Sequence, residues 1–160
     1  YNMAGWRVGA VIGAKPYIDT IMTFRSNMDS GMFKPIQEAA AVALGMGRDW
    51  IENLNMQYQQ RKDAACDIMD YLQLEHDKNG AGLFVWGKIK DLNLDSEALA
   101  NKILYDSRVF ITPGHIFGSQ GDQYLRISLC SPVEDMHAAL DRIKIGSDKY
   151  SSSLNSATAL

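Results

Sequence analysis

The sequence lacks the features that mark membrane-spanning and nucleic-acid-binding proteins. No apolar run approaches the roughly 20 residues of a membrane span, and Leu83-Phe84-Val85-Trp86 has only the length of a strand. Lysine and arginine together number 16 against 19 aspartates and glutamates, which gives a net charge of −3. Because nucleic acids and anionic membranes are bound through basic surfaces, we expect neither as the main partner.

Cysteine and histidine are also scarce, and neither forms a pattern typical of a metal site. Cys66 and Cys130 are far apart and are predicted to be two buried thiols, as in a protein of the reducing cytoplasm. His76, His115 and His137 share no spacing that suggests a metal site or a catalytic triad. We therefore expect no metal, a cytoplasmic location, and histidines that are surface residues or hydrogen-bonded polar ones.

What the sequence does contain is enough apolar material for a globular core. Of its 160 residues, 46% are hydrophobic and 22% are charged, a composition typical of soluble globular proteins. The length predicts one domain or one and a half. No signal peptide is visible, and the chain does not begin with methionine.

The first half is predicted to hold one strand and three helices. Apolar residues alternate over 5–13, which predicts a strand, and its recurring glycines would allow close approach to its backbone. A helix is predicted from Pro16 to about residue 26, and a second over 34–44. A capping-box pattern at Asp49 and Glu52 predicts the start of a long helix. This helix is expected either to bridge two domains or to lie in a single core.

In the second half, the spacing of the apolar residues changes from the period of a helix to the shorter period of a strand. Strands are predicted over 82–89, 109–111 and 124–129, with a helix capped by Asp95 between the first two. Ser131, Pro132 and Glu134 predict the start of the last helix. The serine-rich tail after Gly146 is predicted to be disordered.

Arg126 is the strongest candidate for a functional residue. In the 124–129 strand, alternation places Leu125, Ile127 and Leu129 on one face and Arg126 on the other. Such an arginine is either a solvated residue on the open face of a sheet or a rigid fork that binds a carboxylate with two hydrogen bonds.

The first residues, Tyr1-Asn2-Met3-Ala4-Gly5-Trp6-Arg7-Val8-Gly9, resemble a stretch of the class I/II aminotransferases, fold-type-I enzymes that use pyridoxal 5'-phosphate (PLP). In that family Gly-x-Arg-x-Gly follows the Schiff-base lysine, with the arginine eight residues after it. Counting back from Arg7 places the lysine upstream of Tyr1. The resemblance therefore implies the C-terminal part of a larger enzyme, with no catalytic lysine in this chain and no activity when the chain is isolated.

A second resemblance lies near the C-terminus. Val109 to Gly118, then Gly121, then Tyr124-Leu125-Arg126-Ile127-Ser128 resemble the family signature of a strand, Pro-Gly-x-x-Phe-Gly, a glycine and a Leu-Arg-Ile-Ser strand. The signature arginine binds the α-carboxylate of the substrate, which assigns that role to Arg126. His115 stands where the family usually has a small residue, so the resemblance does not predict the shape of the substrate pocket.

The resemblance implies roles for further residues. Arg7 would neutralise the PLP phosphate, with a structural ion pair as the alternative, and Gly5 and Gly9 would keep the strand clear of the cofactor. The segment from Arg25 to Phe33 is similar to a loop that reaches the neighbouring active site in a homodimer, with Asn27 and, beside it, Ser26 as the candidate contacts. An ordinary turn between two helices is the alternative. The strand Gly80 to Trp86 matches a family strand whose aromatic residues belong to the core.

The implied fold is α/β: the last strand and helices of a PLP-binding large domain, a bridging helix and a small α+β domain. These would cover 1–47, 48–74 and 75–146, with a disordered tail at 147–160, and the small domain would have a short, mainly antiparallel sheet.

The implied function of the intact protein is transfer of an amino group from an amino acid to a 2-oxo acid. Diaminopimelate, aromatic or other broadly accepted amino acids are the expected donors. The alternatives are a PLP-dependent carbon–sulfur lyase of the same fold and a non-enzymatic, aminotransferase-like sensor domain of a transcription regulator.

Overall fold

The computed structural model describes residues 1–91 and 93–157, and for 147–157 only the backbone. The chain divides into two compact units, Tyr1–Leu54 and Asn55–Leu160. The long helix α3, Arg48–Tyr71, begins in the first unit and ends in the second. Among the described residues, no helix combines the length and the hydropathy that crossing a bilayer requires.

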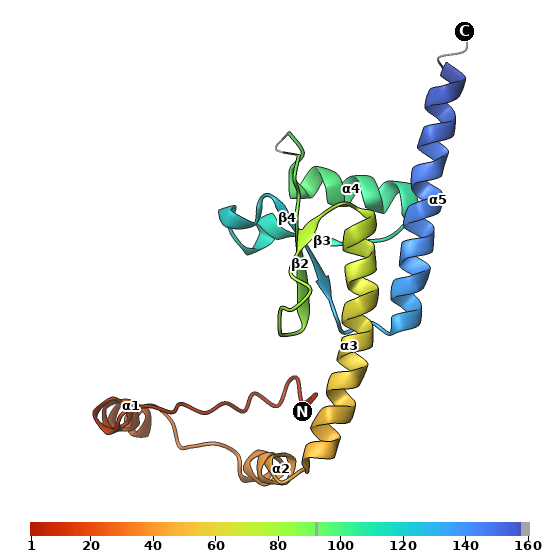
Figure 1. The fold of residues 1–160 in the computed structure, drawn as a ribbon. Coiled ribbons are helices and arrows are strands. Elements are labelled where there is room, and N and C mark those ends of the chain that lie inside the picture. Colours follow the sequence, from red (N-terminus) through yellow and green to blue (C-terminus); the bar gives the residue numbers. More distant parts are fainter. Residues whose placement is uncertain (92, 158–160) are drawn as a thin grey trace. The chain divides into compact units, whose positions relative to one another are not determined.

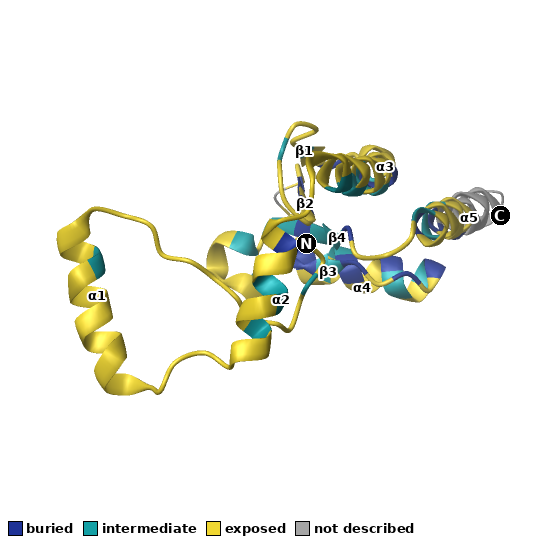
Figure 2. Ribbon diagram, turned by 90° about the horizontal axis from the view of Figure 1, so that it is seen from below, coloured by how far each residue is buried: buried dark blue, intermediate teal, exposed yellow. Residues whose placement is uncertain are grey.

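The first unit consists of an extended N-terminal segment, two helices and the start of α3 (Figure 1). Helix α1 spans Lys15–Met28 and α2 spans Lys34–Leu44. A proline lies in the first turn of each, and for α1 this is as predicted. Of the described residues in this unit, only Ala43 is buried, and Figure 2 shows both helices as mostly exposed.

The strand predicted over 5–13 is not formed. Residues 7–14 carry no strand pairing, and the described part of this unit contains no strand. Strands are stabilised by ladder hydrogen bonds to a neighbour, so the alternating pattern alone cannot produce one here.

The second unit is built on a four-stranded antiparallel sheet with the order β1-β2-β4-β3. Its strands are β1, Glu75–His76; β2, Phe84–Lys88; β3, Thr112–Pro113; and β4, Tyr124–Ser128. The antiparallel sheet is as predicted, except that the strand expected over 109–111 begins only at Thr112. Two further helices complete the unit, α4 at Ser96–Ser107 and α5 at Val133–Ala157.

The core of this unit lies between one face of the sheet and the helices. Leu125 of β4 and Met69 of α3 are completely buried, and Leu129 nearly so. Helix α3 comes so close to the sheet at Gly87 that an added Cβ would lie 2.5 Å from the Met69 sulfur. The Asp95 carboxylate caps α4 by accepting a hydrogen bond from the Ala98 backbone N–H at 2.7 Å, as predicted.

Two expectations for the second unit differ from the structure. Helix α5 continues to Ala157, past Gly146, where we predicted a disordered tail; residues 158–160 lie outside the described part. Gly146 does not end the helix, because it lies where α5 passes α4: an added Cβ would be 3.1 Å from the Asp106 carbonyl oxygen. Cys66 is buried as predicted, but Cys130 is exposed, because it follows β4 in the turn before α5.

Candidate functional site

Arg126 lies at the centre of β4, in the middle of the sheet. In the register, it is opposite Trp86 of β2 on one side and Thr112 of β3 on the other. Leu125, its neighbour in sequence, is completely buried in the core, so alternation directs Arg126 to the opposite face. The predicted placement of this arginine on the open face of the sheet is therefore confirmed.

Aromatic rings surround the guanidinium of Arg126. The Phe84 ring centroid lies 4.1 Å from Cζ, and the Phe117 centroid lies 3.9 Å from it. The Trp86 ring is farther, at 5.7 Å, and supports Phe117 in an edge-on contact with centroids 5.5 Å apart. Distances of this size are typical of cation–π contacts, which stabilise the charged side chain in a defined orientation.

The prediction that the aromatics of the β2 strand belong to the core is wrong. Phe84 is 45% exposed and Trp86 is 38% exposed, whereas Val85 between them is buried. The reason is the period-2 alternation of the strand: Val85 takes the core face, so its neighbours share the open face with Arg126. The sequence carried this signal, but the register that joins it to Arg126 was not visible in it.

Within the described part of the chain, no acidic side chain neutralises Arg126. Among the described residues it has no ion pair, and its Nε atom is buried without a hydrogen-bond partner. An unsatisfied buried donor costs roughly 1–3 kcal/mol, more when it belongs to a charged group. A rigidly held cation that has no partner among the described residues is well suited to bind an external carboxylate.

Two glycines of the C-terminal signature hold Phe117 in place. Phe117 ends the short 3-10 helix η1, Gly114–Phe117, which begins directly after β3. The backbone at Gly114 lies against that of Gly121, and a Cβ on either would overlap the other's backbone. Glycine is therefore required at both positions, and the tight fold that they allow places the Phe117 ring against Arg126.

Two of the three histidines lie within hydrogen-bonding distance of an oxygen atom. His115 also lies on η1, where its Nδ1 is 3.4 Å from the Oγ of the buried Ser96. The His76 side chain is almost fully buried, with Nδ1 3.0 Å from the Leu74 carbonyl oxygen. The described residues contain no group of three or more histidine, cysteine or acidic side chains arranged to hold a metal ion.

The resolved pKa shifts lie on α3 and after β1, away from Arg126. A hydrogen bond from Lys78 lowers the pKa of the Asp70 carboxyl, and the same bond, 2.8 Å long, raises the pKa of Lys78. Burial raises the pKa of the Cys66 thiol, which keeps it in its unreactive protonated form.

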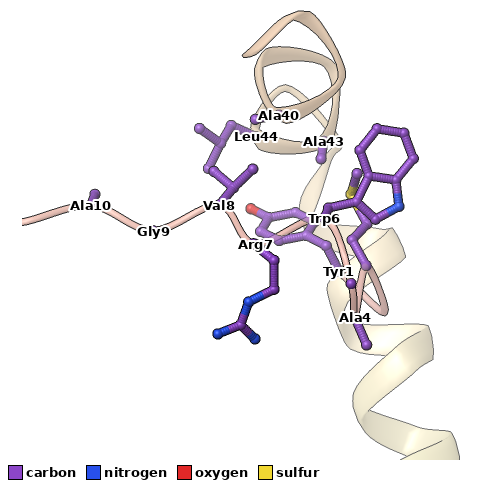
Figure 3. A pocket seen from close by; sticks show the side chains of 12 residues that line it. Tyr1, Ala4, Trp6, Arg7, Val8, Gly9, Ala10, Ala40, Ala43 and Leu44 are labelled. Atoms are coloured by element: carbon purple, nitrogen blue, oxygen red, sulfur yellow. The ribbon is translucent and has the colours of Figure 1, made fainter. Parts of the chain in front are cut away.

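Arg7 lies in the first unit, in the extended N-terminal segment. It lines a hollow of about 460 Å³, and Figure 3 shows its side chain extending away from Val8 and Leu44. The side chain is exposed, and within the described residues it makes no ion pair or side-chain hydrogen bond. An exposed guanidinium that has no ion pair among the described residues is able to bind a phosphate group.

Gly5 and Gly9 line the same hollow as Arg7. A Cβ at either position would meet nothing within 4 Å, so the described residues do not explain them by crowding. Gly5 has φ of +92°, a conformation that glycine adopts without strain, and Arg7 itself is left-handed at φ 54°. The predicted role of both glycines toward a cofactor stays a prediction.

Asn27 and Ser26 lie in the last turn of α1, so the loop that we predicted from Arg25 starts only after Met28. Asn27 Nδ2 donates to the Thr23 carbonyl oxygen at 2.7 Å, and Ser26 Oγ donates to the same oxygen at 3.0 Å. Both residues are exposed. The turn that follows is closed by Asp29, whose carboxylate accepts from the Gly31 N–H at 3.1 Å.

The predicted residues thus fall into three places. Gly5, Arg7 and Gly9 share one hollow, Asn27 lies at the end of α1, and Arg126 belongs to the other unit.

Comparison with known proteins covers nearly the whole chain. The family model for class I and II aminotransferases matches residues 1–143. An LL-diaminopimelate aminotransferase of Maridesulfovibrio salexigens is 33% identical over 143 residues, 89% of this chain and 37% of that protein. The enzyme of the same name from Aquifex aeolicus is 31% identical over 144 residues, 90% of this chain and 37% of its own length.

Solved structures give the same result. The aromatic aminotransferase of Pyrococcus horikoshii superposes with a TM-score of 0.78 and 27% identity, over 92% of this chain and 40% of that one. An aminotransferase of Staphylococcus aureus superposes with a TM-score of 0.78 and 28% identity, over 92% and 39%. The chain therefore spans well under half the length of the relatives that it matches.

Proposed function

Because this chain belongs to the class I and II aminotransferase family, whose members depend on PLP, we propose that it is the C-terminal part of an aminotransferase. The intact protein would transfer an amino group from an amino acid to a 2-oxo acid. The Schiff-base lysine would be none of the lysines of this chain, so the chain alone would be inactive.

Arg126 is the residue whose surroundings support this proposal best. It is a guanidinium fixed by Phe84 and Phe117, on the open face of a sheet, with no acidic partner among the described residues. A planar fork of this kind forms two parallel hydrogen bonds with a carboxylate. In the proposed enzyme it binds and orients the α-carboxylate of the amino acid.

Arg7 would bind the cofactor. Its unpaired guanidinium, beside the hollow that Gly5 and Gly9 also line, would bind the phosphate of PLP. PLP, when bound, supplies the electron-withdrawing ring on which amino transfer depends. Asn27, at the end of α1, would contact the neighbouring active site in a homodimer.

The substrate range follows from the relatives. Two of them are named LL-diaminopimelate aminotransferases and a solved neighbour is named an aromatic aminotransferase. Diaminopimelate and aromatic amino acids are therefore the donors to test first, with 2-oxoglutarate as the acceptor. Release of pyruvate and ammonia from cystathionine, without amino transfer, would instead identify a carbon–sulfur lyase.

The assignment of Arg7 can be tested without measuring turnover. In the full-length protein, Arg7→Ala should weaken the binding of PLP, measured as an apparent dissociation constant by titrating the apoprotein. Arg142→Ala, which removes an exposed arginine from α5, is the matched control and should leave that constant unchanged. Equal PLP affinity in the Arg7→Ala and wild-type proteins would refute the role of Arg7.

A further inference from the structure

Ser96 is a buried polar residue that the proposed function does not use. It is 1% exposed and opens α4, whose cap is the preceding residue, Asp95. The Ser96 backbone N–H donates to the Asp122 carbonyl oxygen at 2.8 Å, and the Ser96 hydroxyl oxygen lies 3.4 Å from Nδ1 of His115. Because a buried hydroxyl is stabilised by a hydrogen-bond partner, the contact with His115 accounts for the serine side chain. Ser96 therefore contacts the chain on both sides of Phe117, at residues 115 and 122.

The contact between Ser96 and His115 lies one short helix away from Arg126. His115 and Phe117 belong to the same single turn, η1. The Phe117 ring centroid lies 3.9 Å from Cζ of Arg126, within the range of a cation–π contact. A shift of His115 would therefore move Phe117 as well and weaken its contact with the guanidinium.

The His115 side chain itself borders a different hollow from the one at Arg126. This hollow has a volume of about 300 Å³, and the residues that line it together with His115 come from the start of α4 and from the loop before β4: Asp95, Ser96, Glu97 and Asp122. Arg126 does not line it. His115 can thus act on Arg126 through Phe117 rather than through contact with the substrate.

From these contacts we infer that Ser96 and His115 are positioning residues, which hold Phe117 against Arg126 and thereby strengthen the binding of the substrate carboxylate. The inference rests on the proposed function, in which Arg126 binds this carboxylate, and adds two residues to it. The physical reason is preorganisation. A guanidinium that Phe117 already holds in place loses less side-chain entropy when the carboxylate binds.

The test uses propionate, a carboxylate without an amino group, as a competitive inhibitor of the full-length enzyme against its amino-acid substrate. Ser96→Ala removes the hydroxyl but keeps the backbone N–H that bonds to Asp122, so the fold should be retained. In Ser96→Ala and in His115→Ala, the inhibition constant of propionate should rise about 2- to 10-fold, the range that loss of one hydrogen bond allows. The KM of the amino acid should rise with it, while kcat stays near the wild-type value.

A double-mutant cycle shows whether the two residues act through one hydrogen bond. If they do, the variant that carries both Ser96→Ala and His115→Ala should bind propionate no more weakly than either single variant. His115→Asn keeps a polar atom close to the position of Nδ1 and should restore the wild-type inhibition constant. His137→Ala, which removes an exposed histidine from α5, is the matched control and should leave that constant unchanged.

The route through Phe117 is tested in a variant that lacks the ring. Phe117 is 49% exposed, so Phe117→Leu opens no cavity in the core, and it should itself weaken inhibition by propionate. In this background His115→Ala should have no further effect. The inference is overturned if His115→Ala causes the same loss with and without the ring, if the effects of Ser96→Ala and His115→Ala add, or if His115→Asn behaves like His115→Ala.

Failure of the underlying function would give a different result. If Arg126→Lys does not weaken inhibition by propionate, Arg126 is not the carboxylate site, and the proposed function fails at that point. If Arg126→Lys weakens it while Ser96→Ala and His115→Ala leave it unchanged, only the positioning role of these two residues is refuted.

Discussion

Replacement of Arg126 by lysine tests the proposed function most directly. Lysine keeps the positive charge but replaces a planar fork with a single ammonium group, which cannot form two parallel hydrogen bonds to a carboxylate. It also loses the guanidinium whose Cζ lies 4.1 Å from the Phe84 ring centroid and 3.9 Å from the Phe117 ring centroid. We expect the loss of transition-state stabilisation to be roughly 2–4 kcal/mol, which corresponds to about 30- to 1000-fold in kcat/KM.

The fold should tolerate this substitution. Leu125 and Leu129 hold β4 from the core face, where both are almost completely buried, and Arg126 contributes nothing to that face. The Arg126→Lys protein should therefore keep its melting temperature and its affinity for PLP while losing activity toward amino acids. The loss should be smaller for amines that have no α-carboxylate.

The assay compares kcat/KM for an amino acid and for an amine in the wild type, in Arg126→Lys and in the control Arg142→Lys. Arg142 is exposed on α5, so its variant should match the wild type on both substrates. An Arg126→Lys enzyme with unchanged kcat/KM for amino acids would show that Arg126 is only a surface arginine. Equal losses for amino acid and amine would show that the variant is damaged in some way other than carboxylate binding.

Three other predictions concern the chain alone, the end of α1 and the contact between α3 and the sheet. The purified chain mixed with PLP should give no saturable, single-site absorbance change and no amino transfer; turnover by this chain would contradict the assignment of the lysine to another part of the protein. In the full-length enzyme, Asn27→Ala should change KM more than the melting temperature. The reason is that the Asn27 side chain is exposed and, among the described residues, forms a hydrogen bond only to the Thr23 carbonyl oxygen. Wild-type kinetics in this variant would show that the segment is an ordinary turn. Gly87→Ala should lower the free energy of unfolding by roughly 1–3 kcal/mol, because the new methyl would meet the Met69 sulfur at 2.5 Å. The measurement is urea denaturation, with Gly47→Ala as the control because Gly47 has open space around it. Equal stability of the two variants would show that the Met69 side chain moves aside without cost.

The sequence by itself determined the elements whose signals are local. The proline start of α1, the Asp95 cap of α4 and the alternation in β4 all depend on residues close together in the chain, and the structure confirms each of them. The placement of Arg126 opposite the core followed from that alternation alone. Its role toward a carboxylate came from the resemblance to the family and stays a proposal.

Tertiary structure decided everything that depends on partners distant in sequence. The alternating residues 5–13 form no strand, because a strand requires a neighbour to pair with. Helix α5 continues through Gly146, because the missing side chain of this glycine lets α5 approach α4 closely. The surroundings of Arg126 are of the same kind: Phe84 and Phe117 lie 33 residues apart, and only the register of β2 with β4 and the fold of η1 bring both rings onto one guanidinium.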